Sequence, residues 1–193
     1  NGNDIPDCCD QGVQCTVGNY PVQWRMEDGG NGHWYQLQLG AGPISWHSAR
    51  LSAVAEGGHL ATLTSVAEND FIRPLVLLGG AWSNNGYIGP WLGGYQDREA
   101  GGYSEPAGGW RWVTNETWSF TAWDPINNQP SNGPLPGEDF LHLTSYSNRW
   151  NDVQCCTDSV LSALVEWSAD CNSDGIVDYG QILNGQLADT NTN

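Results

Sequence analysis

The sequence predicts an α+β domain in which two helices accompany small antiparallel sheets and one long irregular loop. Residues 45–58 and 65–74 carry helix signals, and short segments of strand character lie before and after them. The composition also favours this class, because the chain is rich in Gly (25) and Trp (11) but has only three Phe and one Met. Such a balance suits glycine-rich loops that pack on a few aromatic anchors, each of which buries about 150–250 Å².

The first half of the chain supplies one strand and both helices. Residues 34–39 alternate partly between apolar and polar side chains, as a half-buried strand does. Ser45 is the predicted N-cap of the first helix, which is expected to end near Gly57, where glycine can adopt the left-handed conformation. Ser65 and Glu68 have the spacing of a capping box for the second helix, and Pro74 is expected to end or kink it.

The second half supplies further strands and a long loop. Glycine recurs every few residues from 78 to 107, which indicates loops around one strand at Trp91. The remaining predicted strands are residues 110–113, 141–143 and 160–167. Residues 122–139 contain four prolines and no regular pattern. A structureless stretch of that length in a compact domain is usually functional.

The charge balance narrows the classes of partner. Six Lys and Arg stand against 22 Asp and Glu, a net charge of −16. Nucleic acids and anionic membranes bind basic patches, so we expect neither as a partner. No apolar run reaches the ~18 residues that a membrane-spanning helix needs, so membrane insertion is not expected either. Many of the acids cluster in loops near Gly and Asn, which favours cation binding over a merely solubilising surface.

The six cysteines indicate disulfide bonds and an oxidising compartment outside the cell. Cys8-Cys9 and Cys155-Cys156 are adjacent pairs, and a bridge within such a pair closes a strained ring. We therefore expect Cys155 and Cys156 to bond outward and to tie the two ends of the chain to the domain, each bridge contributing ~2–4 kcal/mol. The order of pairing stays open.

The length fits one domain with appendages. The predicted parts are a Cys-rich arm at residues 1–16, a domain at 17–168 and a tail at 169–193. The sequence has no initiating Met and no basic start followed by an apolar stretch, so we expect a processed or excised part of an exported protein.

The most informative motif is Gln129-Pro130-Ser131-Asn132, followed by Glu138-Asp139 and Trp150-Asn151-Asp152. A proline between amide and hydroxyl side chains, with acids downstream, places several oxygen donors on a stiff backbone. Calcium takes ~6–8 oxygen ligands at ~2.3–2.6 Å, and carboxylates with amide carbonyls supply them well. The motif predicts a long calcium-binding loop region, and the alternative is a metal-free loop held by proline and hydrogen bonds.

This motif resembles the sugar- and calcium-binding loop of the C-type lectin-like domain. In that family a Glu-Pro-Asn or Gln-Pro-Asp triplet precedes a Glu-Asp pair and a Trp-Asn-Asp strand. Other short segments match the family in the same order, namely residues 46–61, 65–71, 91–94, 109–113 and 163–167. The resemblance extends over about residues 30–168.

The resemblance implies a calcium cofactor and a glycan or glycoprotein partner. In the family, the same side chains hold calcium and hydrogen-bond two sugar hydroxyls, and a Gln-first triplet goes with galactose-type ligands. Ser131 departs from the family's Asn or Asp, and its short side chain weakens the site unless Asn132 reaches in. The implied calcium ligands are Glu138, Asn151 and Asp152. The implied carbohydrate-binding residues are Gln129, Ser131, Asn132, Glu138, Asn151 and Asp152.

The resemblance also marks two missing disulfides. The bridge that spans the family's core would fall at Ala53 and Val165, so apolar packing must replace it. The family's loop bridge would join residue 140, which is Phe here, to Cys155.

A second calcium motif lies in the tail. Residues 170–178 place oxygen side chains at loop positions 1, 3, 5 and 9, and Gly175 permits the sharp turn at position 6. The segment resembles half of a dockerin or a thrombospondin type 3 repeat, but an amide replaces the usual acid at position 12. The alternative is an Asp/Asn-rich turn without metal. The predicted ligands are Asp170, Asn172, Asp174, the Ile176 carbonyl, Asp178 and Gln181.

We expect an extracellular, calcium-dependent carbohydrate-recognition or adhesion module that is not an enzyme, because no His lies near a Ser or Cys in a nucleophile motif. The alternative is a structural subunit of an extracellular fibre or matrix, with the lectin-like domain as a bead. Residues 1–7 and 189–193 look like fragments of one calcium-loop module and could join neighbouring copies. They could equally be arbitrary cuts of a longer chain that fray.

Overall fold

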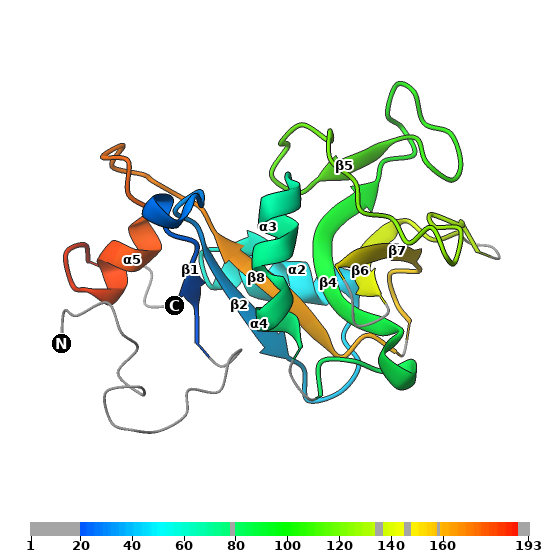
Figure 1. Cartoon of the computed structure of the whole chain (residues 1–193), viewed down its shortest axis with the longest axis horizontal. Helices are drawn as coiled ribbons and strands as arrows, with labels where there is room; N and C mark the ends of the chain where they lie inside the picture. The colour runs from blue at the N-terminus through cyan, green and yellow to red at the C-terminus, as the bar shows by residue number, and fades with distance from the viewer. Residues whose placement is uncertain (1–19, 78–79, 134–136, 145–147, 158, 189–193) are drawn as a thin grey trace.

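The computed structural model describes residues 20–77, 80–133, 137–144, 148–157 and 159–188 (Figure 1). The predictions for the arm at 1–16 and for residues 189–193 lie outside the described residues. The predicted fold class is confirmed, because the described chain combines one mixed sheet with a few short helices.

The described strands form one sheet in the order β1-β2-β8-β4-β6-β7, with β3 paired to β8 and β5 paired to β4. Neighbours are antiparallel except β4 and β8, which meet in parallel at Trp91 and Ala163. The strands are β1 (Val22–Gln23), β2 (Trp34–Leu39), β3 (His59–Leu60), β4 (Ile88–Gln96), β5 (Trp110–Trp112), β6 (Phe140–Thr144), β7 (Arg149–Val153) and β8 (Ser162–Trp167).

Helices cover both faces of the pair formed by β2 and β8 (Figure 1). Successive residues of a strand point to opposite faces. Leu164 of β8 accordingly packs in the core cluster that contains Ile72, whereas Val165 packs in the cluster that contains Ala53. The helical segments are η1 (Met26–Asp28), α2 (Trp46–Ala55), α3 (Val66–Phe71), α4 (Arg73–Val76), η2 (Asn84–Gly86) and α5 (Asp178–Leu183).

The predicted first helix is confirmed at both ends. The Ser45 hydroxyl accepts a hydrogen bond from the Ser48 N–H at 3.1 Å, which is N-cap geometry. Gly57, which follows the helix, has a φ of +75°. Glycine pays no steric cost in that left-handed region.

The second helix follows its predicted start but differs in detail. Ser65 accepts a hydrogen bond from the Glu68 N–H at 3.1 Å, as a capping box requires. The Glu68 carboxylate, however, bonds the Thr64 N–H at 2.7 Å instead of the N–H of Ser65. The helix breaks at Ile72, and Pro74 lies in the first turn of α4, where its missing N–H costs no helical hydrogen bond.

Apolar packing stands where the resemblance places a core disulfide. Ala53 of α2 and Val165 of β8 are both 0% exposed and belong to one buried cluster, which joins that helix to the sheet. Deleting methyl groups from such a site costs stability through lost contacts and a cavity, so the pair contributes to stability without a covalent bond.

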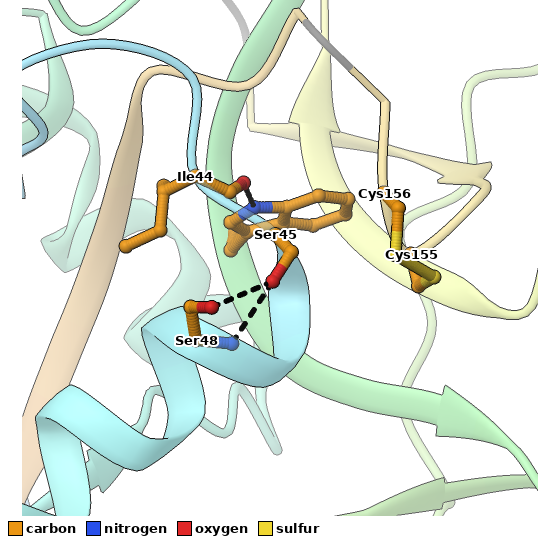
Figure 2. The surroundings of a disulfide bond; sticks show 6 residues. Ile44, Ser45, Ser48, Cys155 and Cys156 are labelled. Atoms are coloured by element: carbon orange, nitrogen blue, oxygen red, sulfur yellow. Dashed lines mark hydrogen bonds between the residues drawn. A yellow bond between two sulfur atoms is a disulfide. The ribbon is translucent and has the colours of Figure 1, made fainter.

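The expectation that Cys155 and Cys156 bond outward is wrong, because the structure joins them to each other (Figure 2). They lie in the turn after β7, and the Cys155 carbonyl accepts the Trp46 N–H at 2.9 Å. Phe140 fills the place of a bridging partner and packs on the Trp46 ring at 4.8 Å between centroids. Cys171 in the tail is exposed and free. Cys8, Cys9 and Cys15 lie outside the described residues.

A close backbone crossing at Gly93 fixes β4 against the segment that follows β3. The Gly93 N–H donates to the Ala61 carbonyl at 2.8 Å. A methyl group at position 93 would lie 2.4 Å from the Leu60 carbonyl oxygen and 2.9 Å from a Val113 methyl carbon. Backbone atoms cannot move aside as a flexible side chain can, so glycine is required here.

We expect Gly93→Ala to lower the free energy of unfolding by ~1–3 kcal/mol, the usual range for an overpacked core position. Chemical denaturation monitored by tryptophan fluorescence measures the change. Gly101→Ala is the matched control, because a Cβ at position 101 meets nothing within 4 Å. Equal unfolding midpoints for the two variants would contradict the prediction.

Candidate functional site

The predicted sugar- and calcium-binding loop is held against β7 by Asp152. This side chain is fully buried and accepts hydrogen bonds from the N–H groups of Ser131 at 2.9 Å and Asn132 at 2.7 Å. Burial raises the pKa of Asp152 and the charge of Glu138 adds to the rise, while the backbone hydrogen bonds oppose it. A nearby cation would favour the charged carboxylate, so this position suits a metal ligand.

Glu138 closes the loop from its other end. Its Oε2 accepts the Gly133 N–H at 2.7 Å and the Ser131 hydroxyl at 3.3 Å. The Glu138 N–H in turn donates to Asn132 Oδ1 at 3.1 Å. The amide oxygen of Asn132 is therefore engaged in holding the loop together.

Two amide oxygens of the predicted set are buried without a hydrogen-bond partner in the described part of the chain. They are Gln129 Oε1 and Asn151 Oδ1. A buried polar atom left unpaired costs ~1–3 kcal/mol, and native proteins leave few of them. Carbonyl and amide oxygens are ligands that calcium prefers. The donor types present therefore fit a calcium ion, since the same loop and strand also supply the carboxylates of Glu138 and Asp152.

His142 in β6 fixes the direction of the Asn151 amide. One ring nitrogen, Nδ1, lies 2.5 Å from the Leu143 carbonyl, which can only accept, so Nδ1 carries the proton. The other, Nε2, must then accept from the Asn151 NH₂ group at 2.9 Å. Burial lowers the pKa of His142 to about 4, so the ring is neutral at physiological pH. With its NH₂ group held there, Asn151 points its oxygen the other way.

The structure brings four of the six predicted loop residues together by hydrogen bonds. Hydrogen bonds join Ser131, Asn132, Glu138 and Asp152, the first two of which lie far from Asp152 in sequence. The other two have different partners: the Asn151 amide bonds His142, and the Gln129 N–H donates to the Asp124 carbonyl at 2.9 Å. Trp150, the first residue of the Trp150-Asn151-Asp152 motif, is 0% exposed.

The tail motif also converges, around Asp174. That carboxylate accepts the side-chain N–H of Gln181 at 2.6 Å and of Asn172 at 3.1 Å. Asp170 accepts the N–H groups of Asp174 and Gly175 at 3.2 and 2.9 Å. Gly175 has a φ of +85°, as the sharp turn at position 6 requires.

Helix α5 attaches this tail motif to the domain, which the sequence did not predict. The Tyr179 ring stacks on Trp167 of β8 at 4.4 Å between centroids and meets Trp34 of β2 edge-on at 5.7 Å. The Asp178 N–H donates to the Ala169 carbonyl at 2.8 Å. Asp178 Oδ1, at predicted loop position 9, is buried without a partner among the described residues.

Solved structures with a similar arrangement are lectin-like domains. The carbohydrate-recognition domain of cow CD23 matches with a TM-score of 0.57 and 20% identity, over 82% of this chain and 98% of that one. Human lithostathine matches with the same score and identity, over 80% and 100%. A calcium-independent type II antifreeze protein matches with a TM-score of 0.55 and 20% identity, over 81% and 95%.

The chain has the C-type lectin-like fold. No protein-family model and no curated protein sequence matches it. At about 20% identity the likeness to solved structures concerns the fold, and the chemistry of the site must come from the residues themselves. Among the described residues, no helix is long and apolar enough to span a membrane.

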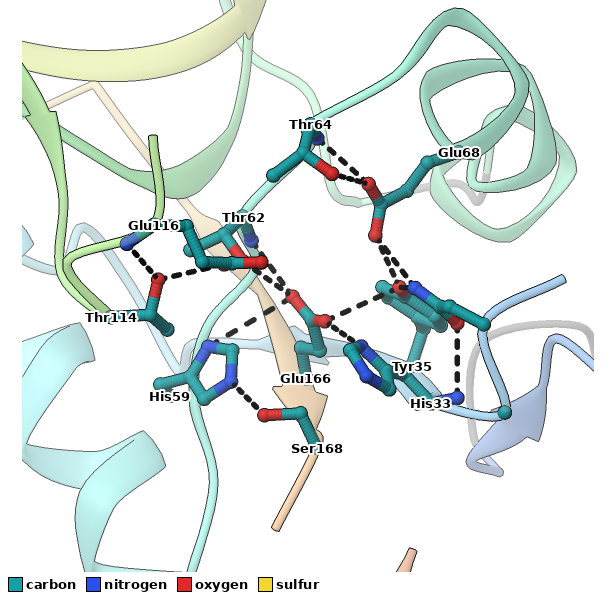
Figure 3. Close-up of polar contacts among 12 residues, drawn as sticks. His33, Tyr35, His59, Thr62, Thr64, Glu68, Thr114, Glu116, Glu166 and Ser168 are labelled. Carbon is teal, nitrogen blue, oxygen red and sulfur yellow. Dashed lines mark hydrogen bonds and ion pairs between the residues drawn. The ribbon is translucent and has the colours of Figure 1, made fainter. Parts of the chain in front are cut away.

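Sequence reasoning missed a buried polar network beneath α3 of the lectin-like domain (Figure 3). The Tyr35 hydroxyl lies 2.6 Å from Glu68 Oε1 and 3.3 Å from Glu166 Oε1, so the two carboxylates meet at one phenol. His33 Nδ1 lies 2.6 Å from Glu166 Oε1. The Glu68 and Glu166 side chains are almost fully buried. The sequence signal was weak, because Glu68 passes for a capping residue.

Each carboxylate oxygen of the network accepts a hydrogen bond from a group of the protein. The outer oxygens of the two carboxylates accept backbone N–H groups, Glu68 from Thr64 at 2.7 Å and Glu166 from Thr62 at 2.8 Å. The ligand atoms of His33, Glu68 and Glu166 all lie within 4.8 Å of one another, close enough to surround an ion. Each carboxylate oxygen already accepts at least one hydrogen bond, so the cluster is complete as a structural element.

The pKa values of three groups in this network, His33, Glu68 and Tyr35, are raised. Burial lowers the pKa of His33, but the hydrogen bond to Glu166 and the attraction of the surrounding carboxylates outweigh it, so the pKa is raised. Burial and the charge of Glu166 raise the pKa of Glu68, against the hydrogen bonds from Tyr35 and Thr64. Burial and both carboxylates raise the pKa of Tyr35 well above its usual range, so it stays a donor.

We expect the protein to lose stability as pH rises above ~6.5. A histidine whose pKa is raised on folding contributes stability that is complete below its unfolded pKa of about 6.5 and lost as pH rises through the folded pKa. For one proton the slope is at most ~1.4 kcal/mol per pH unit. Thermal unfolding between pH 6 and 9 measures it.

His33→Gln should flatten this pH profile, because the neutral amide keeps a donor for Glu166 but binds no proton. His47→Gln is the control, since His47 is exposed on α2. A His33→Gln profile as steep as that of the parent protein would show that another group carries the pH dependence.

Proposed function

We propose that this chain is an extracellular module that recognises a glycan through a calcium ion held by the loop residues and β7. The observation that carries the proposal is the pair of unpaired buried oxygens, Gln129 Oε1 and Asn151 Oδ1, which belong to the same loop and strand as the carboxylates of Glu138 and Asp152. Among the described residues these oxygens have no hydrogen-bond partner, and a hard cation is a partner that would compensate such atoms.

The four side chains supply part of the coordination shell. Calcium takes ~6–8 oxygens, so positions remain for water or for sugar hydroxyls. The ion would bind two neighbouring hydroxyls of one sugar, and the side chains around it would hydrogen-bond the same hydroxyls. Ser131 contributes little, because its hydroxyl lies 3.3 Å from Glu138 Oε2 and donates to it. His142 acts indirectly: its ring nitrogen holds the NH₂ group of Asn151, which orients the amide oxygen.

Similar folds do not by themselves carry this function. The similar cow CD23 domain was solved in the presence of a GlcNAc2Man3 oligosaccharide, whereas a similar antifreeze protein is calcium-independent. The proposal therefore depends on the local oxygen atoms. The association of neighbouring copies through the chain ends stays a prediction, because residues 1–19 and 189–193 lie outside the described residues.

A glycan-array screen with the full chain tests the proposal directly. We expect binding in millimolar calcium, the upper range for extracellular modules, and its loss on addition of a chelator. Galactose-terminated glycans are the first class to inspect, because the triplet begins with Gln129. Binding that survives the chelator, or no binding to any glycan, would overturn it.

Two substitutions in the loop should change calcium affinity in opposite directions. Glu138→Gln removes a negative ligand and should weaken binding, by roughly tenfold or more for one lost charge-assisted contact. Ser131→Asp adds a carboxylate where the family has one and should tighten it. Calorimetric titration measures both, with Glu99→Gln as a control in an exposed loop.

Failure of Ser131→Asp to tighten calcium, together with an unchanged affinity in Glu138→Gln, would mean that this loop is not a metal site.

We also propose a second, weaker calcium site in the tail, formed by Asp170, Asn172, Asp174, the Ile176 carbonyl, Asp178 and Gln181. The support is the convergence of its side chains on Asp174 and the buried, unpaired Asp178 Oδ1. Because Tyr179 of α5 stacks on Trp167, calcium that orders this loop should also alter tryptophan fluorescence.

The double variant Asp170→Ala/Asp174→Ala should lower the calcium stoichiometry by one site and remove the weak phase of the fluorescence titration. Glu99→Ala serves as the acidic control. An unchanged stoichiometry in the double variant would refute the tail site and would leave the proposal of the loop site unaffected.

A further inference from the structure

A pocket of about 380 Å³ opens next to the proposed calcium loop, between the end of β4, the start of β6 and the turn after β7. Small-molecule pockets span roughly 300–1,000 Å³, so its size suits one sugar ring better than a longer chain. The residues that line it are Arg98, Gly137, Asp139, Phe140, Gln154, Cys155 and Cys156.

The pocket adjoins the loop through a single residue, Gly137. A Cβ built at this position would lie 2.4 Å from Arg98 Nη2, in the pocket wall, and 3.1 Å from Asn132 Oδ1, in the loop. The next two residues extend the connection. Glu138 turns to the loop and bonds Gly133, whereas Asp139 turns to the pocket and bonds Arg98.

The polar wall of the pocket is electrically balanced. Asp139 binds the Arg98 guanidinium through two hydrogen bonds, 3.1 Å from Nε to Oδ1 and 2.9 Å from Nη2 to Oδ2. The pairing is bidentate, which fixes the guanidinium plane. A carboxylate has about four lone-pair sites, and Arg98 occupies two of those on Asp139. This wall can accept from a hydroxyl group while offering no net charge to an ion.

The lining also has an apolar part. It consists of the Phe140 ring, held by its packing on Trp46, and the disulfide between Cys155 and Cys156. Disulfide sulfur is soft and polarizable, as thioether sulfur is. A pyranose has a matching two-sided character, because its ring presents C–H groups on its faces and hydroxyls around its edge.

We propose that this pocket is a second sugar subsite, which takes the neutral pyranose next to the one on the calcium ion. The sugar ring lies against Phe140 and the vicinal disulfide, and its hydroxyls reach Asp139 and Arg98. The inference rests on the proposed function and deepens it, because it assigns the module to oligosaccharides in preference to monosaccharides.

The test compares calcium-loaded full-length protein with galactose and lactose, and with mannose and a mannose disaccharide, by calorimetry. We expect one disaccharide to bind roughly 3- to 10-fold more tightly than its monosaccharide, the effect of one or two net hydrogen bonds. Arg98→Met should abolish this ratio and leave monosaccharide affinity unchanged.

Arg111→Met is the matched control. Arg111 pairs with Asp97 at 2.9 Å, its side chain is 48% exposed as that of Arg98 is, and it does not line the pocket. The double variant Cys155→Ser/Cys156→Ser removes the disulfide wall and should also lower the ratio. Thermal unfolding of this double variant shows whether it still folds. If it does not fold, the result for Arg98→Met alone decides whether the pocket is a subsite.

The outcomes separate the two proposals. Monosaccharide binding without a gain for either disaccharide, or a gain that survives in Arg98→Met, overturns the subsite and leaves the proposed function standing. Absence of calcium-dependent binding to all four sugars, together with no calcium-dependent binding to any glycan on the array, overturns both.

Discussion

Two buried carboxylates that meet at one tyrosine hydroxyl hold the lectin-like domain together. Glu68 comes from α3, Glu166 from β8 and Tyr35 from β2, so three elements distant in sequence converge on one point (Figure 3). Each carboxylate also clamps the segment after β3 through a backbone N–H, at Thr62 and Thr64. Removing one partner from a buried charged group costs ~3–5 kcal/mol because the other is left uncompensated. His33 lowers that risk by bringing a positive charge to Glu166.

This network helps to position the loop of the candidate site. It fixes β8 against β2, and β8 is the strand from which the sheet extends through β4 to β6 and β7. β7 carries Asn151 and Asp152. The Asp152 carboxylate accepts hydrogen bonds from the backbone N–H groups of two loop residues, Ser131 and Asn132. The described residues of the loop contain no helix and no strand beyond the isolated bridge of Trp123 to Trp150, so its shape depends on these contacts. The site is therefore a property of the sheet edge and of the few side chains that face it.

Local signals predicted much of the fold. Ser45, Ser65 and the alternating strands mark their elements because capping and periodicity act within a few residues. What the sequence could not give was long-range: the meeting of Glu68 with Glu166, and the stacking of Tyr179 on Trp167. The bond between Cys155 and Cys156 was missed because ring strain was weighed without the turn that places them. For the candidate site, residue types were predictable from the motif, but the orphaned oxygens and the role of His142 required coordinates.

Whether a domain of this fold binds calcium depends on how each oxygen is satisfied. A neutral amide oxygen that already accepts a hydrogen bond gains less from an ion than an unpaired buried oxygen does. Asn132 belongs to the first kind, since its amide oxygen accepts the Glu138 N–H. Gln129 and Asn151 belong to the second. The neutral ring of His142 accepts from the Asn151 NH₂ group and so leaves the Asn151 oxygen unpaired. A protonated ring would instead donate to the amide and turn its oxygen toward the histidine. The buried histidine thus links the apolar core to the chemistry of the loop.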